Sequence, residues 1–150
     1  VNDGHGATRS LVAVTRVLRG NLSRSDMLVS PPWLAPGGAV MVTMRLRNIG
    51  AVAIGGRLRY IPPMPLSIVA GSAYASSGAV SQPGQELEWN GDILPQAMVM
   101  VRFQVTAPPG TPIQAVNNQA TLRDAGGLEH MLGATIIVNP RLMFFAEVHR

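Results

Sequence analysis

The 150-residue sequence contains no cysteine. Disulfide bonds, thiolate nucleophiles and cysteine-ligated metals are therefore excluded. Lysine is also absent, because all 12 of the Lys and Arg residues are arginine. Lysine–asparagine isopeptide cross-links, which staple some surface adhesins, therefore cannot form in this chain.

Charged residues are scarce, at 13% of the chain, while hydrophobic residues make up 47%. This composition excludes an intrinsically disordered protein, and the length is enough for one domain with a buried core. A surface with few charges favours assembly with other chains. The arginines are scattered, apart from the pairs Arg45/Arg47 and Arg57/Arg59. Without a basic patch or helix, no nucleic-acid partner is expected.

No apolar run reaches the 18 or more residues that a membrane span needs, so no direct membrane insertion is expected. A secretory signal peptide is not visible, and the chain begins with Val1 instead of Met. We therefore expect a processed product or a fragment. Removal of an export signal is one explanation, and it would place the protein outside the cell or on the cell surface.

Patterns that support catalysis are also scarce. Glu86 and Glu88 are the only closely spaced carboxylates, and neighbours on one strand face project in parallel. Glycosidases instead place their carboxylate pair across a cleft. The three histidines (His5, His130 and His149) do not have the spacing of a zinc site. We therefore predict a protein that is not an enzyme and binds no cofactor or metal.

Alternation of apolar and polar residues is the dominant pattern. Two long segments, 39–47 and 97–106, and the shorter 132–138 each present one apolar face. The residues expected to face a core are Val40, Val42, Met44 and Leu46, then Val99, Val101, Phe103 and Val105, then Ala134, Ile136 and Val138.

Turn signals rich in proline, glycine, asparagine or aspartate separate these segments. They include "NGD" at 90–92 and "DAGG" at 124–127, where Asp92 and Asp124 are interpreted as turn formers. With 12 Pro and 16 Gly spread along the chain, a helix of ordinary length has little room. The prediction is an all-β, antiparallel Ig-like β-sandwich of about seven to nine strands. Strands are expected near 9–18, 39–47, 53–60, 66–74, 86–90, 97–106, 113–122, 132–138 and 141–148, with a long loop or an edge strand in 19–35.

From Pro36 to Pro140 the order of motifs resembles an immunoglobulin-like cell-surface repeat, the family called domain-of-unknown-function eleven. The motifs are "APGGAVMVTMRLRN", Asn-x-Gly at 48–50, "LEWNGDILP" with Trp89 and Pro95, and "PGTPIQAVNNQATL" with Asn118. An Asp that the family usually carries before a Leu-Pro is missing from "RYIPPMPLS". The resemblance implies an Ig-like sandwich, an exported location and a structural or adhesive role without catalytic residues.

These motif residues also have physical roles. Asn48 and Gly50 suit a turn. Trp89 alternates with Glu86 and Glu88, so it is expected to fill the centre of the sandwich. Asn118 is expected to bond loop backbone, because a buried polar group needs a partner.

Three parts of the chain are distinguished on this basis. Residues 1–35 form an N-terminal extension with a strand near 9–18, residues 36–139 form the sandwich, and residues 140–150 form a C-terminal strand or tail. One face of the last segment is wholly apolar, whereas the N-terminal strand is apolar on both faces. The residues concerned are Leu142, Phe144, Ala146 and Val148 at the C-terminus, and Leu11, Val12, Ala13 and Val14 at the N-terminus.

Three interpretations of these terminal strands remain open. In the first, either terminal strand adds to a sheet edge of another copy, which builds a filament because head-to-tail addition does not close. They can instead be outer strands of their own domain, or the C-terminal one can begin a second repeat.

We accordingly predict a structural subunit of an extracellular assembly, such as a surface filament, a pilus-like fibre or a layer. Its main partners would be copies of itself. The alternatives are a carbohydrate- or protein-binding adhesion module, with a surface glycan as partner and Trp33, Tyr60 and Tyr74 as candidates, or a virion decoration protein. Arg45, Arg47, Arg57 and Arg59 would grip an acidic glycan or phosphate only if their strands were neighbours. Ordinary surface charge or ion pairing between subunits is the competing interpretation.

Overall fold

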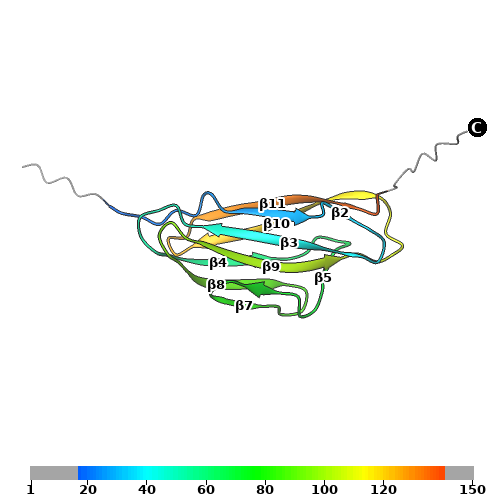
Figure 1. Cartoon of the computed structure of the whole chain (residues 1–150), viewed down its shortest axis with the longest axis horizontal. Helices are drawn as coiled ribbons and strands as arrows, with labels where there is room; N and C mark the ends of the chain where they lie inside the picture. Colours follow the sequence, from blue (N-terminus) through cyan, green and yellow to red (C-terminus); the bar gives the residue numbers. More distant parts are fainter. Residues whose placement is uncertain (1–16, 141–150) are drawn as a thin grey trace, which may run out of the picture.

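The computed structural model describes residues 17–140, which form a sandwich of two β-sheets (Figure 1). Within this range there is no helix, and hence none long and apolar enough to cross a membrane. The predicted all-β class is confirmed. Residues 17–140 form eleven strands, and seven of these have five or more residues.

The first sheet has five antiparallel strands. Their order is β1 (Asp26–Ser30), β3 (Ala39–Arg47), β9 (Met98–Thr106) and β5 (Ser67–Ile68), and β6 (Tyr74–Ala75) also pairs with β9.

The second sheet has six strands. Their order is β2 (Trp33–Leu34), β11 (Glu129–Val138), β10 (Gln114–Asp124), β4 (Ile54–Tyr60), β8 (Leu87–Ile93) and β7 (Ala79–Ser81). All pairs in this sheet are antiparallel except that of β2 with β11, which is parallel.

The predicted alternation accounts for which residues face the core. Along β3 and β9 every second side chain is buried between the sheets, as expected for strands with one face in the core. The same holds at the end of β11, where Ile136 and Val138 are buried and Ala134 is partly buried against the core. The two-residue period of the sequence therefore predicts both where these strands lie and which of their faces is buried.

The core is built around large aromatic side chains at its centre. Trp89 is completely buried, as predicted, and its Nε1 donates a hydrogen bond to the carbonyl of Ser77 at 2.7 Å. Tyr60 and Phe103, one from each sheet, place their ring centroids 4.8 Å apart. Gly78 lies directly against Trp89, since a Cβ there would be 2.6 Å from the indole Nε1. The chain has no cysteine and hence no disulfide, so the two sheets are held together by the packing of side chains such as Tyr60 and Phe103.

The sandwich includes residues that were assigned to the N-terminal extension. It was expected to begin at residue 36, but β1 pairs with β3 and β2 pairs with β11. The chain therefore crosses from one sheet to the other between Ser30 and Trp33. Of the two alternatives given for residues 19–35, the structure has the edge strand, since β1 and β2 each lie at the edge of a sheet. The break between them was not predicted, and it falls at the two prolines of "SPPW".

Two further local predictions were wrong. The "NGD" segment forms part of strand β8 instead of a turn, with Asp92 opposite Gly55 on β4. The single strand expected over 66–74 is divided into β5 and β6, and β7 was not anticipated. The predicted strands near 9–18 and 141–148 lie in residues 1–16 and 141–150, outside the described residues, except that Val17 and Leu18 are described and not in a strand.

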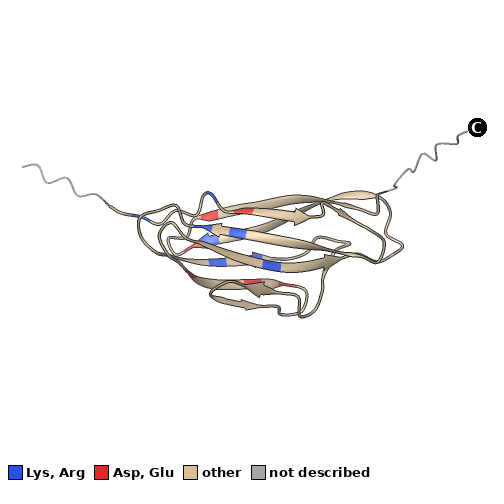
Figure 2. Ribbon diagram, in the orientation of Figure 1, with Lys and Arg blue, Asp and Glu red and all other residues tan. Residues whose placement is uncertain are grey.

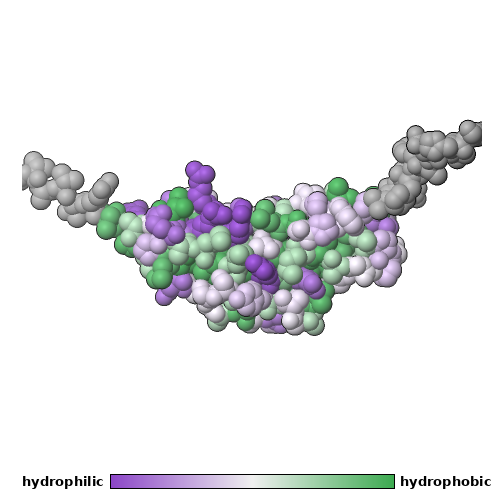
Figure 3. Space-filling view, in the orientation of Figure 1, coloured by the Kyte–Doolittle hydropathy of each residue, from purple (hydrophilic) through white to green (hydrophobic). Residues whose placement is uncertain are grey.

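The described chain enters at one end of the long axis and leaves at the other (Figure 1). Arginines and acidic residues lie on several strands and are intermixed (Figure 2). In space-filling view, apolar and polar residues are also intermixed over the visible face (Figure 3).

Replacing Trp89 with alanine should lower the free energy of unfolding by about 3–5 kcal/mol, because it removes a fully buried side chain and leaves a cavity. Urea denaturation followed by circular dichroism measures this change. Tyr74→Ala is the matched control, since Tyr74 is 58% exposed, and it should change stability by less than about 1 kcal/mol. Equal losses in both variants would contradict a core centred on Trp89.

Candidate functional site

The two arginine pairs do not meet in the structure. Arg45 and Arg47 lie on β3 in the five-stranded sheet, whereas Arg57 and Arg59 lie on β4 in the six-stranded sheet. The strands are not neighbours, so the condition for a grip on an acidic ligand by all four guanidinium groups is not met.

One arginine of each pair forms an ion pair within the chain. Arg45 donates from Nε to Asp26 Oδ1 at 2.7 Å and from its second nitrogen to Oδ2, which links β3 to β1. Arg59 forms a similar two-point contact with Glu86, next to the start of β8. Hydrogen bonding from Arg45 lowers the pKa of Asp26, and hydrogen bonding from Arg59 lowers the pKa of Glu86. These contacts join neighbouring segments and give Arg45 and Arg59 partners within the chain.

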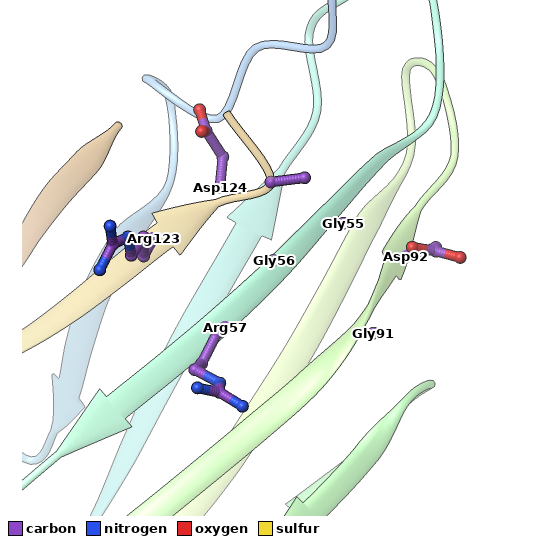
Figure 4. A pocket seen from close by; sticks show the side chains of 8 residues that line it. Gly55, Gly56, Arg57, Gly91, Asp92, Arg123 and Asp124 are labelled. Carbon is purple, nitrogen blue, oxygen red and sulfur yellow. The ribbon is translucent and has the colours of Figure 1, made fainter. Parts of the chain in front are cut away.

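A shallow hollow lies on the outer face of the six-stranded sheet, where β4 begins and β8 and β10 end (Figure 4). Arg57 and Arg123 are direct neighbours across β4 and β10. Beside Arg57 on this face, Gly55 carries no side chain, which leaves room for the hollow, whereas Gly56 and Gly91 line it with backbone only because their missing side chains would point toward the core.

The charges in this hollow are balanced. Asp92 and Asp124 also line it, together with the two arginines. Arg57 donates from Nε to Asn90 Oδ1 at 3.0 Å. The Oδ1 of Asp124 accepts from the backbone N–H groups of Gly126 and Leu128, at 2.9 and 3.0 Å, so Asp124 is a turn former as predicted. The hollow can hold a small polar group, but it contains no nucleophile beside a base.

Asn48 is the most connected polar side chain of the described part of the chain. It is 1% exposed. Its Oδ1 accepts from the backbone N–H groups of Asn21, at 3.0 Å, and Gly50, at 2.9 Å. Its Nδ2 donates to the carbonyls of Val52, at 2.8 Å, and Ile93, at 2.9 Å. All four hydrogen-bonding positions of the carboxamide are thus used.

Gly50 of the same motif allows a close approach of backbone. A Cβ at this position would lie 2.3 Å from the carbonyl oxygen of Arg19 and 2.6 Å from the Cα of Gly20. Backbone hydrogen bonds from Ile49 to Asn21 and from Ala51 to Arg19 complete the contact. The Asn-x-Gly motif is therefore a turn, as predicted, and it also holds the segment through which the chain enters the sandwich.

Asn118 differs from its predicted role. It is buried on β10, and its Oδ1 accepts a hydrogen bond from the Tyr60 hydroxyl at 2.9 Å instead of bonding loop backbone. Burial raises the pKa of Tyr60, so the hydroxyl remains protonated and able to donate. Tyr60 is fully buried, which removes it from the candidates for glycan binding. Pro95, the remaining motif residue, follows directly after β8 and Leu94 in the turn before β9.

The histidines and acidic residues of the described ranges form no group of three or more that could hold a metal ion. His130 Nε2 lies 3.9 Å from Asp124 Oδ2. His5 and His149 lie outside the described residues, as do the eight predicted assembly residues: Leu11, Val12, Ala13, Val14, Leu142, Phe144, Ala146 and Val148.

Comparison with known proteins finds similarity in fold but not in sequence. No protein-family model and no curated protein matches the chain. Among solved structures, the major pilin subunit BcpA of Bacillus cereus is similar over 93% of this chain, with a TM-score of 0.63 and 12% identity. Domains D2 and D3 of the major pilin SpaD of Corynebacterium diphtheriae are similar over 76% of this chain, with a TM-score of 0.55 and 11% identity.

AvmM, which catalyses macrocyclization in alchivemycin A biosynthesis, gives a TM-score of 0.55 and 9% identity over 88% of this chain and 100% of its own. The match covers only 46% of BcpA and 51% of the SpaD structure. The likeness at these identities shows an Ig-like sandwich of the kind found in pilins, and the same fold also supports an enzyme.

Replacing Asn48 with alanine should lower the free energy of unfolding by about 2–4 kcal/mol, because it leaves buried backbone groups without partners. The matched control is Asn90→Ala, which removes one exposed contact with Arg57 and should cost less than about 0.5 kcal/mol. Urea titration measures both. Amide hydrogen exchange at Asn21 and Gly50 should speed up only in the Asn48 variant, and unchanged exchange would contradict its role in holding the entering segment.

The ion pairs predict a dependence of stability on pH. Since the pKa values of Asp26 and Glu86 are lowered in the folded protein, their contribution is present above the carboxylate pKa of the unfolded chain. It is lost as the pH falls from about 5 toward 2. The Asp26→Asn/Glu86→Gln double variant should show a shallower decline of the urea midpoint over this range. Glu129→Gln, which changes an exposed carboxylate outside both pairs, should keep the wild-type slope, and a wild-type slope in the double variant would refute the assignment.

Proposed function

We propose that the protein is a non-enzymatic structural subunit of an extracellular assembly, such as a surface filament, a pilus-like fibre or a layer. The observation that carries this proposal is the placement of the two ends of the described chain at opposite ends of the long axis (Figure 1). A subunit with this geometry can contact one neighbour through each end, and repetition of such a contact extends in one direction.

Strand addition between subunits is the proposed contact. Residues 141–148 alternate so that Leu142, Phe144, Ala146 and Val148 share one face, and residues 9–18 are apolar on both faces. A strand of either kind can add to a sheet edge of another copy, with backbone hydrogen bonds giving affinity and alternate side chains giving specificity.

The proposal includes a cellular location and a family. We place the protein outside the cell or on the cell surface, after removal of an export signal, and we assign it to the Ig-like repeat family that its motifs resemble. The similarity to the pilin folds supports a surface role. The packing of Asn48, Gly50 and Trp89 gives each of these motif residues a structural task that a repeat of this kind would need.

An adhesion module that binds a surface glycan is the second candidate. A hollow on the outer face of the six-stranded sheet is lined by four polar residues and three apolar ones, which are Arg59, Asn117, Gln119 and Thr121, then Ile61, Pro63 and Met131. Amide and hydroxyl side chains of this kind hydrogen-bond sugars. Trp33 on β2 is 43% exposed, and an exposed aromatic ring can stack on a sugar. Binding of glycans by the monomer on an array would favour this candidate.

Deletion of residues 140–150 should convert large assemblies into folded monomers, because the proposed donor strand is removed. Multi-angle light scattering gives the mass, and circular dichroism checks the fold. Assemblies that persist unchanged after the deletion would contradict a C-terminal donor. A matched variant with Leu142 and Phe144 changed to serine keeps the length of the tail and should also remain monomeric.

A further inference from the structure

Strand β11 has a long unpaired edge. On one side it pairs with β10 along its whole length, from Glu129 to Val138. On the other side only Ile137 and Val138 have a partner, which is the two-residue strand β2. Within residues 17–140 no strand pairs with 129–136 on that side.

Hydrogen bonds near β2 show which backbone groups face this edge. The N–H groups of Ile137 and Asn139 donate to the carbonyls of Pro32 and Leu34, at 3.0 and 2.8 Å, on the β2 side. Backbone groups alternate in direction along a strand, so every odd-numbered residue of β11 points the same way. The carbonyl of Leu128, an even position, accepts from Asp124 on the β10 side, as this alternation requires.

Four residues therefore present both N–H and C=O groups to the open edge: Glu129, Met131, Gly133 and Thr135. All four are exposed, Met131 to 61%. Strand β1 lies beside β11, but its backbone pairs with β3 in the other sheet. The other edge strands of the described residues are shorter: five residues in β1, three in β7, and two each in β2, β5 and β6. An edge of this length is a template for pairing with another chain.

We propose that residues 141–148 of a second copy occupy this edge, parallel to β11 and in line with the acceptor's own β2. This inference rests on the proposed function and names the surface that receives the donor strand. The open edge (129–136) and the donor (141–148) are each eight residues long.

The direction follows from the two ends of the molecule. Leu128 and His130, at the start of β11, line one hollow together with Arg19 and Gly20, so the open edge begins at the end where the chain enters. Residue 140 lies at the opposite end (Figure 1). In a head-to-tail row, the tail of one copy therefore meets the start of the next copy's edge and runs along it toward β2.

The same tail is poorly placed for its own edge. It leaves after Asn139, whose backbone is bonded to Leu34 of β2. Strand β2 occupies the position next to Ile137 and Val138, so a tail that folded back would meet β2 first. A neighbouring copy has no such obstacle at residues 129–136.

Apolar side chains are available on both faces of the edge. On the inner side, Val29 and Ala134 are only partly buried against the core. On the outer side, Met131 is exposed. The donor's face of Leu142, Phe144, Ala146 and Val148 would cover the inner side, and Met143 and Phe145 would lie beside Met131.

Thr135→Pro tests the edge in the full chain. Proline removes an N–H that faces the edge and leaves the pairing with β10 intact, and edge positions tolerate proline. Thr135→Val is the matched control, because both variants lose the hydrogen bond from Thr135 to Asn117 but valine keeps the N–H. Sedimentation against concentration should show association about tenfold weaker in the proline variant and unchanged in the valine variant. Equal association of both would overturn the proposal.

Disulfide trapping covers the case in which the proline variant fails to fold. The chain has no cysteine, so pairs of single-cysteine variants can be mixed and oxidised. Met131→Cys and Thr135→Cys should each cross-link to a cysteine in 141–148 of another copy, and the partner of 135 should be later in sequence than the partner of 131. The reverse order, or no intermolecular cross-link at these positions, would overturn parallel addition.

Two other outcomes separate this inference from the proposed function. Removal of residues 140–150 can abolish assembly while Thr135→Pro associates normally and no cross-link forms at positions 131 and 135. In that case the donor binds elsewhere, and only its assignment to the edge of β11 is wrong. If cysteines in 9–16 cross-link to position 131 or 135 within one chain, the N-terminal segment occupies the edge and the inference is wrong. A full-length chain that stays monomeric at every concentration overturns both proposals.

Discussion

The four hydrogen bonds of Asn48 are the interaction on which the rest of the structure depends. One buried carboxamide joins three segments: the entering chain at Asn21, its own turn at Gly50 and Val52, and the end of β8 at Ile93. Gly50 makes this possible, because only a residue without a Cβ lets the backbone of Arg19 and Gly20 come so close. The point at which the chain enters the sandwich is thereby fixed at one end of the molecule. A buried amide with every position satisfied stabilises this arrangement, whereas an unsatisfied one would oppose it.

The entering segment in turn determines how the sandwich is closed. From Asn21 the chain passes into β1 in one sheet and then, after two prolines, into β2 in the other. Because β2 has only two residues, it covers the end of β11 and leaves the beginning unpaired. A longer β2 would protect the whole strand and make a closed monomer. The same crossover that pairs the entering chain with both sheets therefore leaves most of β11 unpaired on one side. The open edge is a consequence of the topology and not of any single residue.

Sequence patterns were sufficient for the long strands and insufficient for the short ones. Segments such as 98–106 alternate over nine residues, so period alone identifies the strand and its buried face. Strands of two or three residues, such as β2, β5 and β7, are too short to show a period, and tertiary pairing determines them. The "NGD" segment has the composition of a turn, yet β4 continues opposite it and holds it in β8. The partners of the ion pairs could not be predicted from the sequence either, because Arg59 and Glu86 are distant in the chain and meet only through the pairing of β4 with β8.

The fold by itself does not decide between structural and catalytic roles, since pilin domains and a macrocyclization enzyme share it. The decision has to come from sites. In the described part of the chain Arg45 is paired with Asp26 and Arg59 with Glu86, and Arg57 and Arg123 line a hollow together with two aspartates. Such pairing joins neighbouring strands and stabilises the fold. Within residues 17–140, the backbone of β11 from Glu129 to Ile136 has no strand partner on one side. Unpaired N–H and C=O groups in a row are a feature that another strand would complete, and for that reason the proposed assembly uses this edge and not a pocket.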